Sequence, residues 1–418
     1  MGQPQGEPGL PTRWPDAGHR AWLAAEGARL LAFGRTSIVP GDGFGWLDRD
    51  GRLELDRPVA TWITARMTHV YALATLRGDP DGPSLVDHGL AALASPLQDH
   101  MNGGWFEGRA DTDRKLAYTH AFVVLAASSA HLAMRPGAED LLARALSVVR
   151  QRFLDARPGV TWESYDADWS TREDYRGANS AMHLVEALLA ASDATEDPFW
   201  RSQALEVARD YVHEQAPTHA WLIPEHRAPD GSVLPGFNAE RKDDPFRPYG
   251  ATPGHAFEWA RLLVCLEAAM NGAGEPAPKW LASDARHLFD VATEVGWAGD
   301  GTGFVYTVDW DGRPVVPARF HWVLCEAIAA AAVLYRRTGE SSYGDRYAEW
   351  WNVARARYID VQGGSWWHEL APDGHPTAPD RAVWPGKPDI YHAYQATLVP
   401  VQPPGGSLAG SLAVPPPL

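Results

Sequence analysis

The chain has 418 residues, of which 45% are hydrophobic and 22% are charged, and its formal net charge at pH 7 is −16. This composition is typical of a soluble globular protein with a large core. The negative charge argues against nucleic acid or an anionic membrane as a partner, because both favour basic surfaces. We find no membrane-spanning stretch and no secretory leader, so we expect a reduced, cytoplasmic protein.

Cysteine and tryptophan usage agree with that expectation. Cys265 and Cys325 each lie in an apolar run and are predicted to be reduced core thiols. The 19 tryptophans outnumber both the 13 tyrosines and the 12 phenylalanines, and many lie in Gly-rich stretches. Because an indole ring can stack on the C–H face of a sugar, we expect most tryptophans to pack in the core and a few to contact a ligand.

Hydrophobic periodicity predicts twelve helices along the chain. Residues 121–133 are too apolar for a surface helix and are expected to be buried, whereas residues 138–154 have one polar face and should form an outer helix. The predicted helices cover residues 18–34, 59–78, 83–98, 113–134, 138–155, 175–194, 197–215, 251–271, 278–296, 318–338, 340–358 and 389–400.

The connections between these helices alternate in kind. A Gly/Trp-rich, strand-like stretch follows each odd-numbered helix, and a short polar link follows each even-numbered one. The strand-like stretches are residues 43–47, 103–107, 160–164, 220–225, 303–307 and 364–369. Six such cycles predict an all-α fold, an (α/α)6 barrel of twelve helices in six hairpins with short strand-like loops on one end. An open α-solenoid is the alternative, although its repeats usually run about 33–47 residues.

The predicted domain organisation is simple. Residues 18–400 would form a single catalytic barrel domain. Residues 1–17 and the Pro/Gly-rich residues 401–418 have little helical signal and are expected to be flexible N-terminal and C-terminal tails.

Polar side chains gather at the starts of the even-numbered helices. In an (α/α)6 barrel these helices should form the inner ring, with their N-terminal ends facing the long loops, so the side chains would share one pocket. The set comprises Arg66, Tyr118, His120, Asn179, His183, Glu186, Arg247, His255, Glu258, His321, Trp322, Glu326, Asp389, His392 and Gln395.

Histidine chemistry makes this pocket a candidate acid–base site. His255 and His392 each open a helix and have Glu258 or Gln395 three residues on, on the same helical face. An imidazole with a pKa near 6.5 takes up and returns a proton at neutral pH. We expect Glu258 to hold the His255 ring in one tautomer. Helix N-termini favour developing enolate charge.

Two other kinds of site are compatible with parts of this pattern. Arg66 and Arg247 could stabilise the enolate or bind an anion, or form internal salt bridges. Bundle metal sites use Glu-x-x-His, whereas here the glutamates follow the histidines, and no H-E-x-x-H or zinc-type cysteine pair occurs. We therefore predict no metal. A paired-carboxylate glycosidase on the same barrel stays open; its candidate acids are Glu107, Asp174, Glu225 and Glu326.

Three motifs resemble a known family. They are R-G-A-N-S-A-M-H-L-V-E-A (176–187), P-F-R-P-Y-G-A-T-P-G-H-A-F-E-W (245–259) and W-P-G-K-P-D-I-Y-H-A-Y-Q-A (384–396). The chain resembles the N-acylglucosamine 2-epimerase superfamily over residues 18–400, and looks most like its bacterial D-mannose isomerase branch. The resemblance implies the (α/α)6 barrel and cofactor-free, metal-independent interconversion of an aldose and its 2-ketose.

The resemblance also implies a substrate and residue roles. D-Mannose and D-fructose, and further D-lyxose and D-xylulose, would interconvert through a cis-enediol, with His255 and His392 as the acid–base pair. The partner would be a monosaccharide, and the protein a monomer or a homodimer. The residues implied in sugar binding, together with their neighbours at the helix starts, are Arg66, Tyr118, Asn179, His183, Glu186, Arg247, Glu258, His321, Trp322, Glu326 and Asp389.

Some positions depart from related branches. Sulfoquinovose isomerases tend to have a tryptophan pair where this chain has His321-Trp322, and a tryptophan at the position of Pro388; some relatives have glutamine in place of Glu186. These changes weaken the alternatives of a sulfoquinovose isomerase or a sugar 2-epimerase. From other classes, an (α/α)6 glycoside hydrolase and a non-catalytic carbohydrate-binding protein are the remaining hypotheses.

Overall fold

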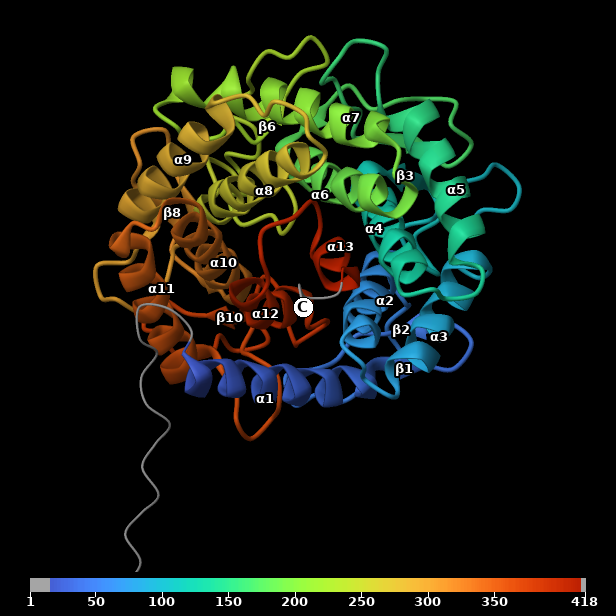
Figure 1. Ribbon diagram of the computed structural model, residues 1–418, viewed down its shortest axis with the longest axis horizontal. Helices are drawn as coiled ribbons and strands as arrows, with labels where there is room; N and C mark the ends of the chain where they lie inside the picture. Colours follow the sequence, from blue (N-terminus) through green and yellow to red (C-terminus); the bar gives the residue numbers. More distant parts are fainter. Residues whose placement is uncertain (1–15, 415–418) are drawn as a thin grey trace, which may run out of the picture.

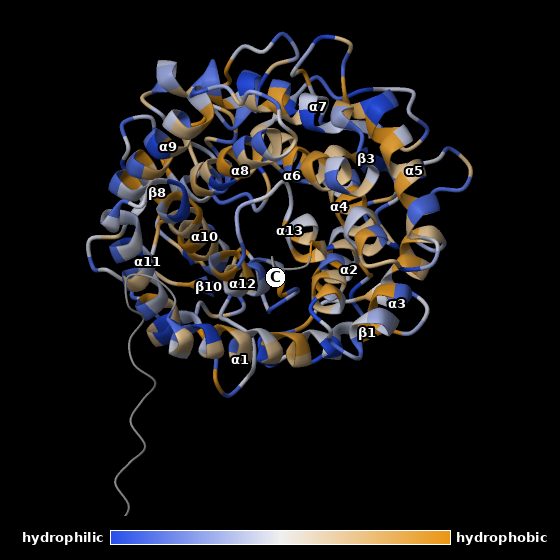
Figure 2. Ribbon diagram, viewed as in Figure 1, coloured by the Kyte–Doolittle hydropathy of each residue, from blue (hydrophilic) through white to orange (hydrophobic). Residues whose placement is uncertain are grey.

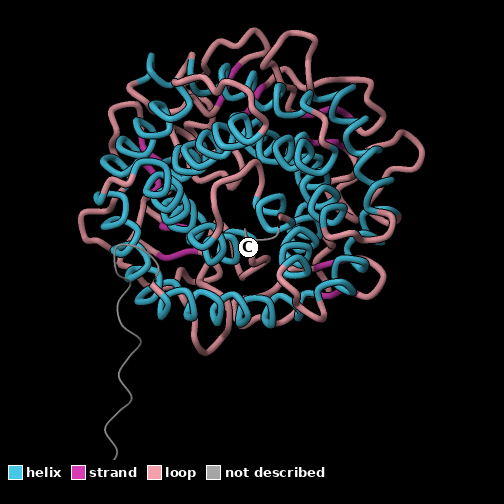
Figure 3. The backbone as a smooth tube through the Cα atoms, in the orientation of Figure 1, coloured by secondary structure: helices cyan, strands magenta, loops and turns pink. Residues whose placement is uncertain are grey.

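A computed structural model describes residues 16–414, and its helices form two concentric rings (Figure 1, Figure 3). The inner ring consists of α2 (Thr61–Leu76), α4 (Ala117–Leu132), α6 (Ala178–Thr195), α8 (Pro253–Gly272), α10 (His321–Thr338) and α12 (Tyr391–Leu398). The outer ring consists of α1 (Ala17–Gly34), α3 (Gly82–Ala94), α5 (Ala138–Val148), α7 (Pro198–Ala208), α9 (Trp280–Gly296) and α11 (Ser341–Val353).

The inner ring is closed. Each inner helix packs against the next one along the chain, and α12 packs against both α10 and α2. The predicted all-α (α/α)6 barrel is therefore confirmed, and the open solenoid is wrong. Short turns of 3-10 or π-helix extend several helices and connections: η1 (Arg35–Ser37), η2 (Val149–Phe153), η3 (Arg209–His213), η4 (Ala216–His219), η5 (Ala354–Tyr358) and η6 (Val399–Val401).

The apolar pattern of each helix explains the ring it occupies. In α4, residues 117–130 are all buried, as expected for a helix packed on every side. In α5, Leu141, Leu142 and Ala145 are buried while the acidic residues of the first turn face solvent. Figure 2 shows the same contrast, with α2 and α4 largely orange and blue segments on outer helices such as α5 and α9. Both predictions from periodicity are thus confirmed.

Short antiparallel strand pairs lie in the long loops. They are β1 (Ile38–Val39) with β2 (Gly43–Phe44), β3 (Arg114–Leu116) with β4 (Ser164–Asp166), β5 (Arg176–Gly177) with β6 (His226–Arg227), β7 (Thr307–Val308) with β8 (Pro314–Val316), and β9 (Arg319–Phe320) with β10 (Glu369–Leu370). Because β3, β5 and β9 run directly into α4, α6 and α10, each pair fixes the start of an inner helix.

A repeated hydrogen bond completes this arrangement. The first amide of an inner helix donates to a carbonyl of the following long loop: Thr61 to Glu107 at 2.8 Å, Ala117 to Glu163 at 2.8 Å, Ala178 to Glu225 at 2.9 Å and His321 to His368 at 3.0 Å. One of the four free amides at each helix start is thereby satisfied. The equivalent loop residues are consequently brought to the same end of the barrel as the inner-helix N-termini.

The C-terminal segment differs from the expected flexible tail. Residues 401–414 fold back against the barrel, and α13 (Leu408–Ala413) contacts α2, α4 and α6, within the inner ring in Figure 1. Asp193 accepts hydrogen bonds at 2.7 Å from both the backbone amide and the hydroxyl of Ser407. Small residues let this segment approach the inner helices closely, and that fit carries no periodic signal.

The remaining parts of the predicted tails, residues 1–15 and 415–418, lie outside the described residues. Of the N-terminal tail, Asp16 is described and caps α1, because its side chain accepts a hydrogen bond from the amide of His19 at 2.8 Å. Among the helices of residues 16–414, none combines the length and the apolar character that crossing a membrane requires.

Candidate active site

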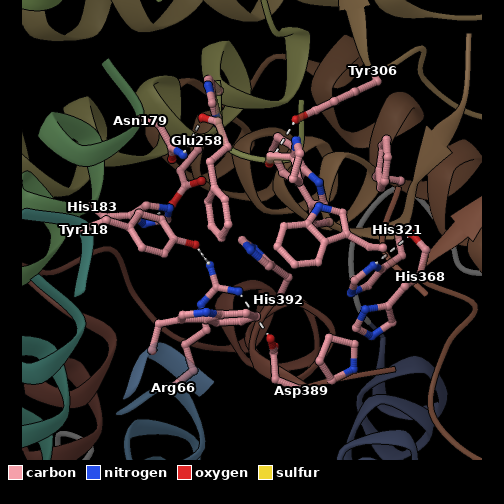
Figure 4. A pocket seen from close by; sticks show the side chains of 18 residues that line it. Arg66, Tyr118, Asn179, His183, Glu258, Tyr306, His321, His368, Asp389 and His392 are labelled. Carbon is pink, nitrogen blue, oxygen red and sulfur yellow. Dashed lines mark hydrogen bonds and ion pairs between the residues drawn. The ribbon is translucent and has the colours of Figure 1, made fainter. Parts of the chain in front are cut away.

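A cavity of about 690 Å³ lies where the inner helices begin (Figure 4). Ten of the thirteen residues predicted for the site line it: Arg66, Tyr118, Asn179, His183, His255, Glu258, His321, Trp322, Asp389 and His392. The other lining residues are Trp62, Pro245, Phe246, Tyr306, Phe320, His368, Trp384 and Pro388. The sequence pattern therefore predicts the place of the pocket, but it does not predict the loop residues that line it.

Three predicted residues do not line this cavity. Arg247 is not among the lining residues, and its guanidinium pairs with Glu173 at 2.7 and 3.0 Å, so the salt-bridge alternative holds for this arginine. Glu326 lies behind His392, and Glu186 accepts a hydrogen bond from the hydroxyl of Tyr391. Both glutamates thus support other side chains, and the expected place of all three on the cavity wall is wrong.

His392 is held by a carboxylate. Its Nδ1 lies 3.0 Å from Oε1 of Glu326. The imidazole is buried, and burial together with the nearby positive charge of Arg66 holds the pKa of His392 well below its usual range. The His392 ring is therefore neutral at neutral pH. A hydrogen bond from the ring to the Glu326 carboxylate places its single proton on Nδ1.

His255 is held in the same way by a different residue from the one expected. Its Nδ1 lies 2.9 Å from each carboxylate oxygen of Glu225. Glu258 sits one helical turn deeper and lies 3.3 Å from Arg261, so the prediction that Glu258 orients His255 is wrong. Glu225 comes from the loop after α7, at the repeat position whose carbonyl accepts from the first amide of α6.

Trp322 lies against both histidines. Its ring centroid is 5.3 Å from that of His255 and 5.9 Å from that of His392. Within residues 16–414, the protein makes no hydrogen bond to Nε2 of either histidine. Both Nε2 atoms are thus available to a ligand in one cavity. In each ring, Nδ1 pairs with a carboxylate, as in hydrolytic triads.

Arg66 provides positive charge on another wall. It lies 3.2 Å from Asp389 and donates to the hydroxyl of Tyr118 at 2.8 Å, contacts that Figure 4 draws as dashed lines. Burial opposes a charged guanidinium, but Tyr118, Asp389 and Tyr391 together hold the pKa of Arg66 above its usual value. Burial raises the pKa of Tyr118 to about 12. Arg66 is therefore a fixed cation with hydroxyl and carboxylate neighbours.

His183 and Glu258 present polar atoms that the described protein leaves unpaired. Nδ1 of His183 and Oε2 of Glu258 are buried without hydrogen-bond partners. Burial lowers the pKa of His183 to about 4. Burial, reinforced by the nearby Glu326, raises the pKa of Glu258 well above its usual range. The imidazole of His183 and the carboxyl group of Glu258 thus both line the cavity, and burial favours the uncharged form of each.

The same corner has the spacing of a metal site. One ligand atom from each of His183, Glu186 and Glu258 lies within 4.8 Å of the other two. However, the guanidinium of Arg261 already lies 3.3 Å from Glu258 and 3.5 Å from Glu186. Arg261 therefore supplies positive charge to both carboxylates, and this donor set does not require an ion for charge balance.

A second pair of imidazoles lines the side of the cavity near α12. The rings of His321 and His368 stack with centroids 3.8 Å apart, and Nε2 of each is buried without a partner within residues 16–414. Burial lowers the pKa of His321 to about 4. His368 was missed in the sequence, although it occupies the repeat position of Glu107, Glu163 and Glu225 in the long loops.

Aromatic rings also line the cavity. Phe246 lies 5.1 Å from Trp384 and 5.4 Å from Tyr118, and Trp62 lies 5.9 Å from Trp384, as measured between ring centroids. Trp62, Trp322 and Trp384 are the cavity tryptophans of the described chain. Their apolar faces are suited to the C–H faces of a sugar.

The glycosidase alternative requires two carboxylates facing a substrate. Of its candidate acids, Glu225 pairs with His255 and Glu326 pairs with His392, and neither Glu107 nor Asp174 lines the cavity. Burial raises the pKa of Glu107 to about 7, and the nearby Asp111 adds to the rise. The cavity thus lacks the proposed acid pair and is instead centred on histidines.

Comparison with known proteins agrees with this geometry. Residues 43–396 match the model of the N-acylglucosamine 2-epimerase family. The chain belongs to this family. It is 51% identical to a D-mannose isomerase of Thermobifida fusca over 403 residues, which cover 95% of this chain and 98% of the relative. It is 48% identical to a D-mannose isomerase of Pseudomonas cannabina pv. alisalensis, over 94% and 95% of the two chains. The family and these relatives indicate an isomerase enzyme.

Two solved structures share the barrel. The crystal structure of a D-mannose isomerase superposes with a TM-score of 0.85 at 27% identity, covering 93% of this chain and 99% of the other. A cellobiose 2-epimerase from Spirochaeta thermophila superposes with a TM-score of 0.78 at 22% identity, covering 91% and 95%. The second likeness bears on the fold alone.

Proposed function

We propose that the protein is a D-mannose isomerase that interconverts D-mannose and D-fructose without a metal ion. The observation that carries this proposal is the pair His255 and His392, whose Nε2 atoms are open to one cavity while each Nδ1 is tied to a carboxylate. The names of the two relatives that are about half identical over nearly the whole chain support the same substrate.

The proposed chemistry is proton transfer in the open-chain sugar. A neutral imidazole Nε2 removes the proton from C2 of the aldose while O1 gains a proton, which gives a cis-enediol. The proton then returns to C1 while the hydroxyl on C2 loses its proton, which gives the 2-ketose. The two half-reactions balance without an external oxidant, reductant or co-reactant, so the histidine pair and bound sugar suffice.

We assign the transfer between the carbons to His392. Its pKa is held well below the usual range by burial and by Arg66, so the base form is populated at neutral pH. His255 would then assist ring opening and move protons among the oxygens. The fixed charge of Arg66 and the carboxyl group of Glu258, whose protonated form burial favours, are placed to stabilise oxygen atoms that gain negative charge.

Substrate recognition in this proposal follows from the cavity walls. Tyr118, Asn179, His183, His321 and Asp389 offer hydrogen bonds to hydroxyl groups, and the aromatic rings offer apolar faces. D-Lyxose has the D-mannose configuration at the carbons that react, so we expect D-lyxose and D-xylulose as a further pair. We also propose a cytoplasmic enzyme that acts as a monomer or a homodimer.

Proton NMR of D-mannose incubated with the protein in D2O and EDTA tests the function. We expect D-fructose, which carries deuterium at C1 wherever the proton on His392 exchanges with D2O before it returns, and no product with the His392→Ala variant. D-Glucose in place of fructose would establish a 2-epimerase. Activity that EDTA abolishes and a divalent ion restores would refute the metal-free mechanism. If D-mannose is unchanged, the proposal is wrong, and sulfoquinovose and then oligosaccharide hydrolysis are the next assays.

A further inference from the structure

Arg261 is a buried residue of α8 that contacts three glutamates at once. Its Nε donates to Oε2 of Glu326 at 2.8 Å, and its Nη2 lies 3.3 Å from Glu258 and 3.5 Å from Glu186. The residue is 5% exposed and is not among those that line the active-site cavity. A guanidinium so placed acts on the pocket only through the carboxylates that it contacts.

One of these contacts leads directly to a catalytic histidine. Oε2 of Glu326 accepts from Arg261, while Oε1 of the same carboxylate lies 3.0 Å from Nδ1 of His392. Arg261, Glu326 and His392 therefore form a continuous chain from the barrel interior to the cavity. The chain crosses from α8 to α10 to α12, so it also sets how these three inner helices meet.

We propose that Arg261 is a positioning residue that holds Glu326 as a carboxylate and thereby keeps the proton of His392 on Nδ1, leaving the Nε2 lone pair free to take a proton from the sugar. This inference deepens the proposed function and rests on it. It concerns the tautomer of one ring, and it assigns no contact between Arg261 and the substrate.

The charges around Arg261 give the physical reason. Three buried carboxyl groups converge on this one guanidinium, and both burial and mutual repulsion favour their protonated forms. Burial raises the pKa of Glu326, and Arg261 opposes that rise. Without Arg261, Glu326 would take up a proton and donate it to Nδ1. The ring proton would then reside on Nε2, where the lone pair is required.

The proposal predicts different responses of His392 and His255 to the loss of Arg261. Glu225, which holds His255, forms no ion pair with an arginine or lysine in the part of the chain that the structure describes. Loss of Arg261 should therefore change the tautomer of His392 and leave that of His255 unchanged. A general loosening of the fold would affect both rings, so the contrast distinguishes positioning from structural support.

The fold also leaves space for a free guanidinium ion to replace the arginine side chain in an Arg261→Ala variant. Arg261 lines a second cavity of about 540 Å³, which lies between the inner helices and the C-terminal segment 402–411 and is partly open to solvent. In an Arg261→Ala variant the vacated volume adjoins this cavity. A free guanidinium ion has the planar donor fork of the arginine side chain, so we expect millimolar guanidinium to restore activity partly, and urea at the same concentration to have no such effect.

The matched control is Arg337. It also joins α8 and α10 through a two-pronged ion pair, with Nε 2.6 Å and Nη2 2.9 Å from the carboxylate of Glu267, but it is half exposed and distant from the cavity. Arg337→Ala therefore removes a similar helix-to-helix pair without touching Glu326. We expect wild-type kcat and a wild-type pH profile from this variant.

The kinetic test compares Arg261→Ala, Arg261→Lys and Arg337→Ala with D-mannose. For Arg261→Ala we expect kcat to fall on the order of 100-fold or more, as for a catalytic histidine in the wrong tautomer, with KM nearly unchanged. The acid limb of its pH profile should move to higher pH, because Glu326 must lose its proton. Arg261→Lys keeps the positive charge beside Glu326, so the acid limb of its pH profile should coincide with that of the wild type.

A readout without activity separates this inference from the proposed function. In protein labelled with 15N-histidine, nitrogen chemical shifts report the tautomer of each ring; the His392 signal is assigned by its loss in His392→Gln. We expect the Nδ1–H form in wild type and Arg261→Lys, and the Nε2–H form in Arg261→Ala. The same tautomer in all three would overturn the inference even if D-mannose isomerises. If the wild type does not isomerise D-mannose, the function fails while the tautomer result stands.

Discussion

Both carboxylate oxygens of Glu225 lie 2.9 Å from Nδ1 of His255. This pairing joins a long loop to the first turn of α8, and the loop itself is anchored because the carbonyl of Glu225 accepts the first amide of α6. The orientation of His255 thus depends on the junction of two repeats. A carboxylate at this place fixes the ring tautomer and stabilises the ring when it gains a proton.

Replacement of Glu225 tests that pairing. Glu225→Gln keeps the size of the side chain but removes its charge, so the Nδ1–H tautomer of His255 loses its preference. We expect kcat for D-mannose to fall on the order of 10³-fold, with KM changed little. Steady-state kinetics beside Glu206→Gln, a change in a glutamate at the outer surface, provide the measurement. A kcat within tenfold of wild type would show that Glu225 does not orient a catalytic ring.

Replacement of Glu258 by glutamine should reduce activity much less than the same replacement of Glu225. Burial and the nearby Glu326 raise the pKa of Glu258 well above its usual range, which favours the protonated carboxyl group, a hydrogen-bond donor. A glutamine amide is also a neutral donor of similar shape. We therefore expect Glu258→Gln to retain kcat/KM within about tenfold of wild type, and Glu258→Ala to lose on the order of 100-fold, the cost of a lost donor to developing charge. Equal losses in the two variants would mean that Glu258 works as a carboxylate.

The pH dependence of activity follows from the pKa of His392. Burial and Arg66 hold this pKa well below 6.5, and the ring is active as a base only when it is neutral. As pH falls, activity is lost only when the ring gains a proton, so the acid limb of kcat/KM should lie below pH 6.5 rather than at it. Rates from pH 4.5 to 9, with circular dichroism to verify folding, test this expectation. An acid limb above pH 6.5 would contradict it.

Much of the fold could be predicted because it is periodic. Each helix has an apolar pattern that differs between the inner and outer rings, as α4 and α5 show, and six similar connections require a closed ring. The polar helix starts follow from the same repeat, which explains why ten predicted residues line one cavity. Periodicity thus gives both the barrel and the location of the pocket.

The errors concern contacts between segments that are distant in sequence. The sequence predicts both Arg247 and Arg66 for the pocket, but only Arg66 lines the cavity, and Arg247 pairs instead with Glu173 in another loop. Closeness in sequence to His255 favours Glu258, whereas the fold brings Glu225 to the ring from a distant loop. His368 and Glu225 occupy one repeat position, whose carbonyl accepts from the first amide of the preceding inner helix. Alignment of the repeats would have identified these residues.

The C-terminal segment provides the last test. Asp193 accepts from both the amide and the hydroxyl of Ser407 at 2.7 Å, and α13 beyond it packs on three inner helices. Asp193→Ala leaves both donors of Ser407 without their partner at a partly buried position. We expect the free energy of unfolding in urea to fall by about 1–3 kcal/mol. The control is Glu349→Ala, which removes an exposed ion pair with Arg346 and should cost less than about 1 kcal/mol. If the two variants unfold at the same urea concentration, the segment contributes no more to stability than a surface ion pair, and the initial expectation of a flexible tail would be restored.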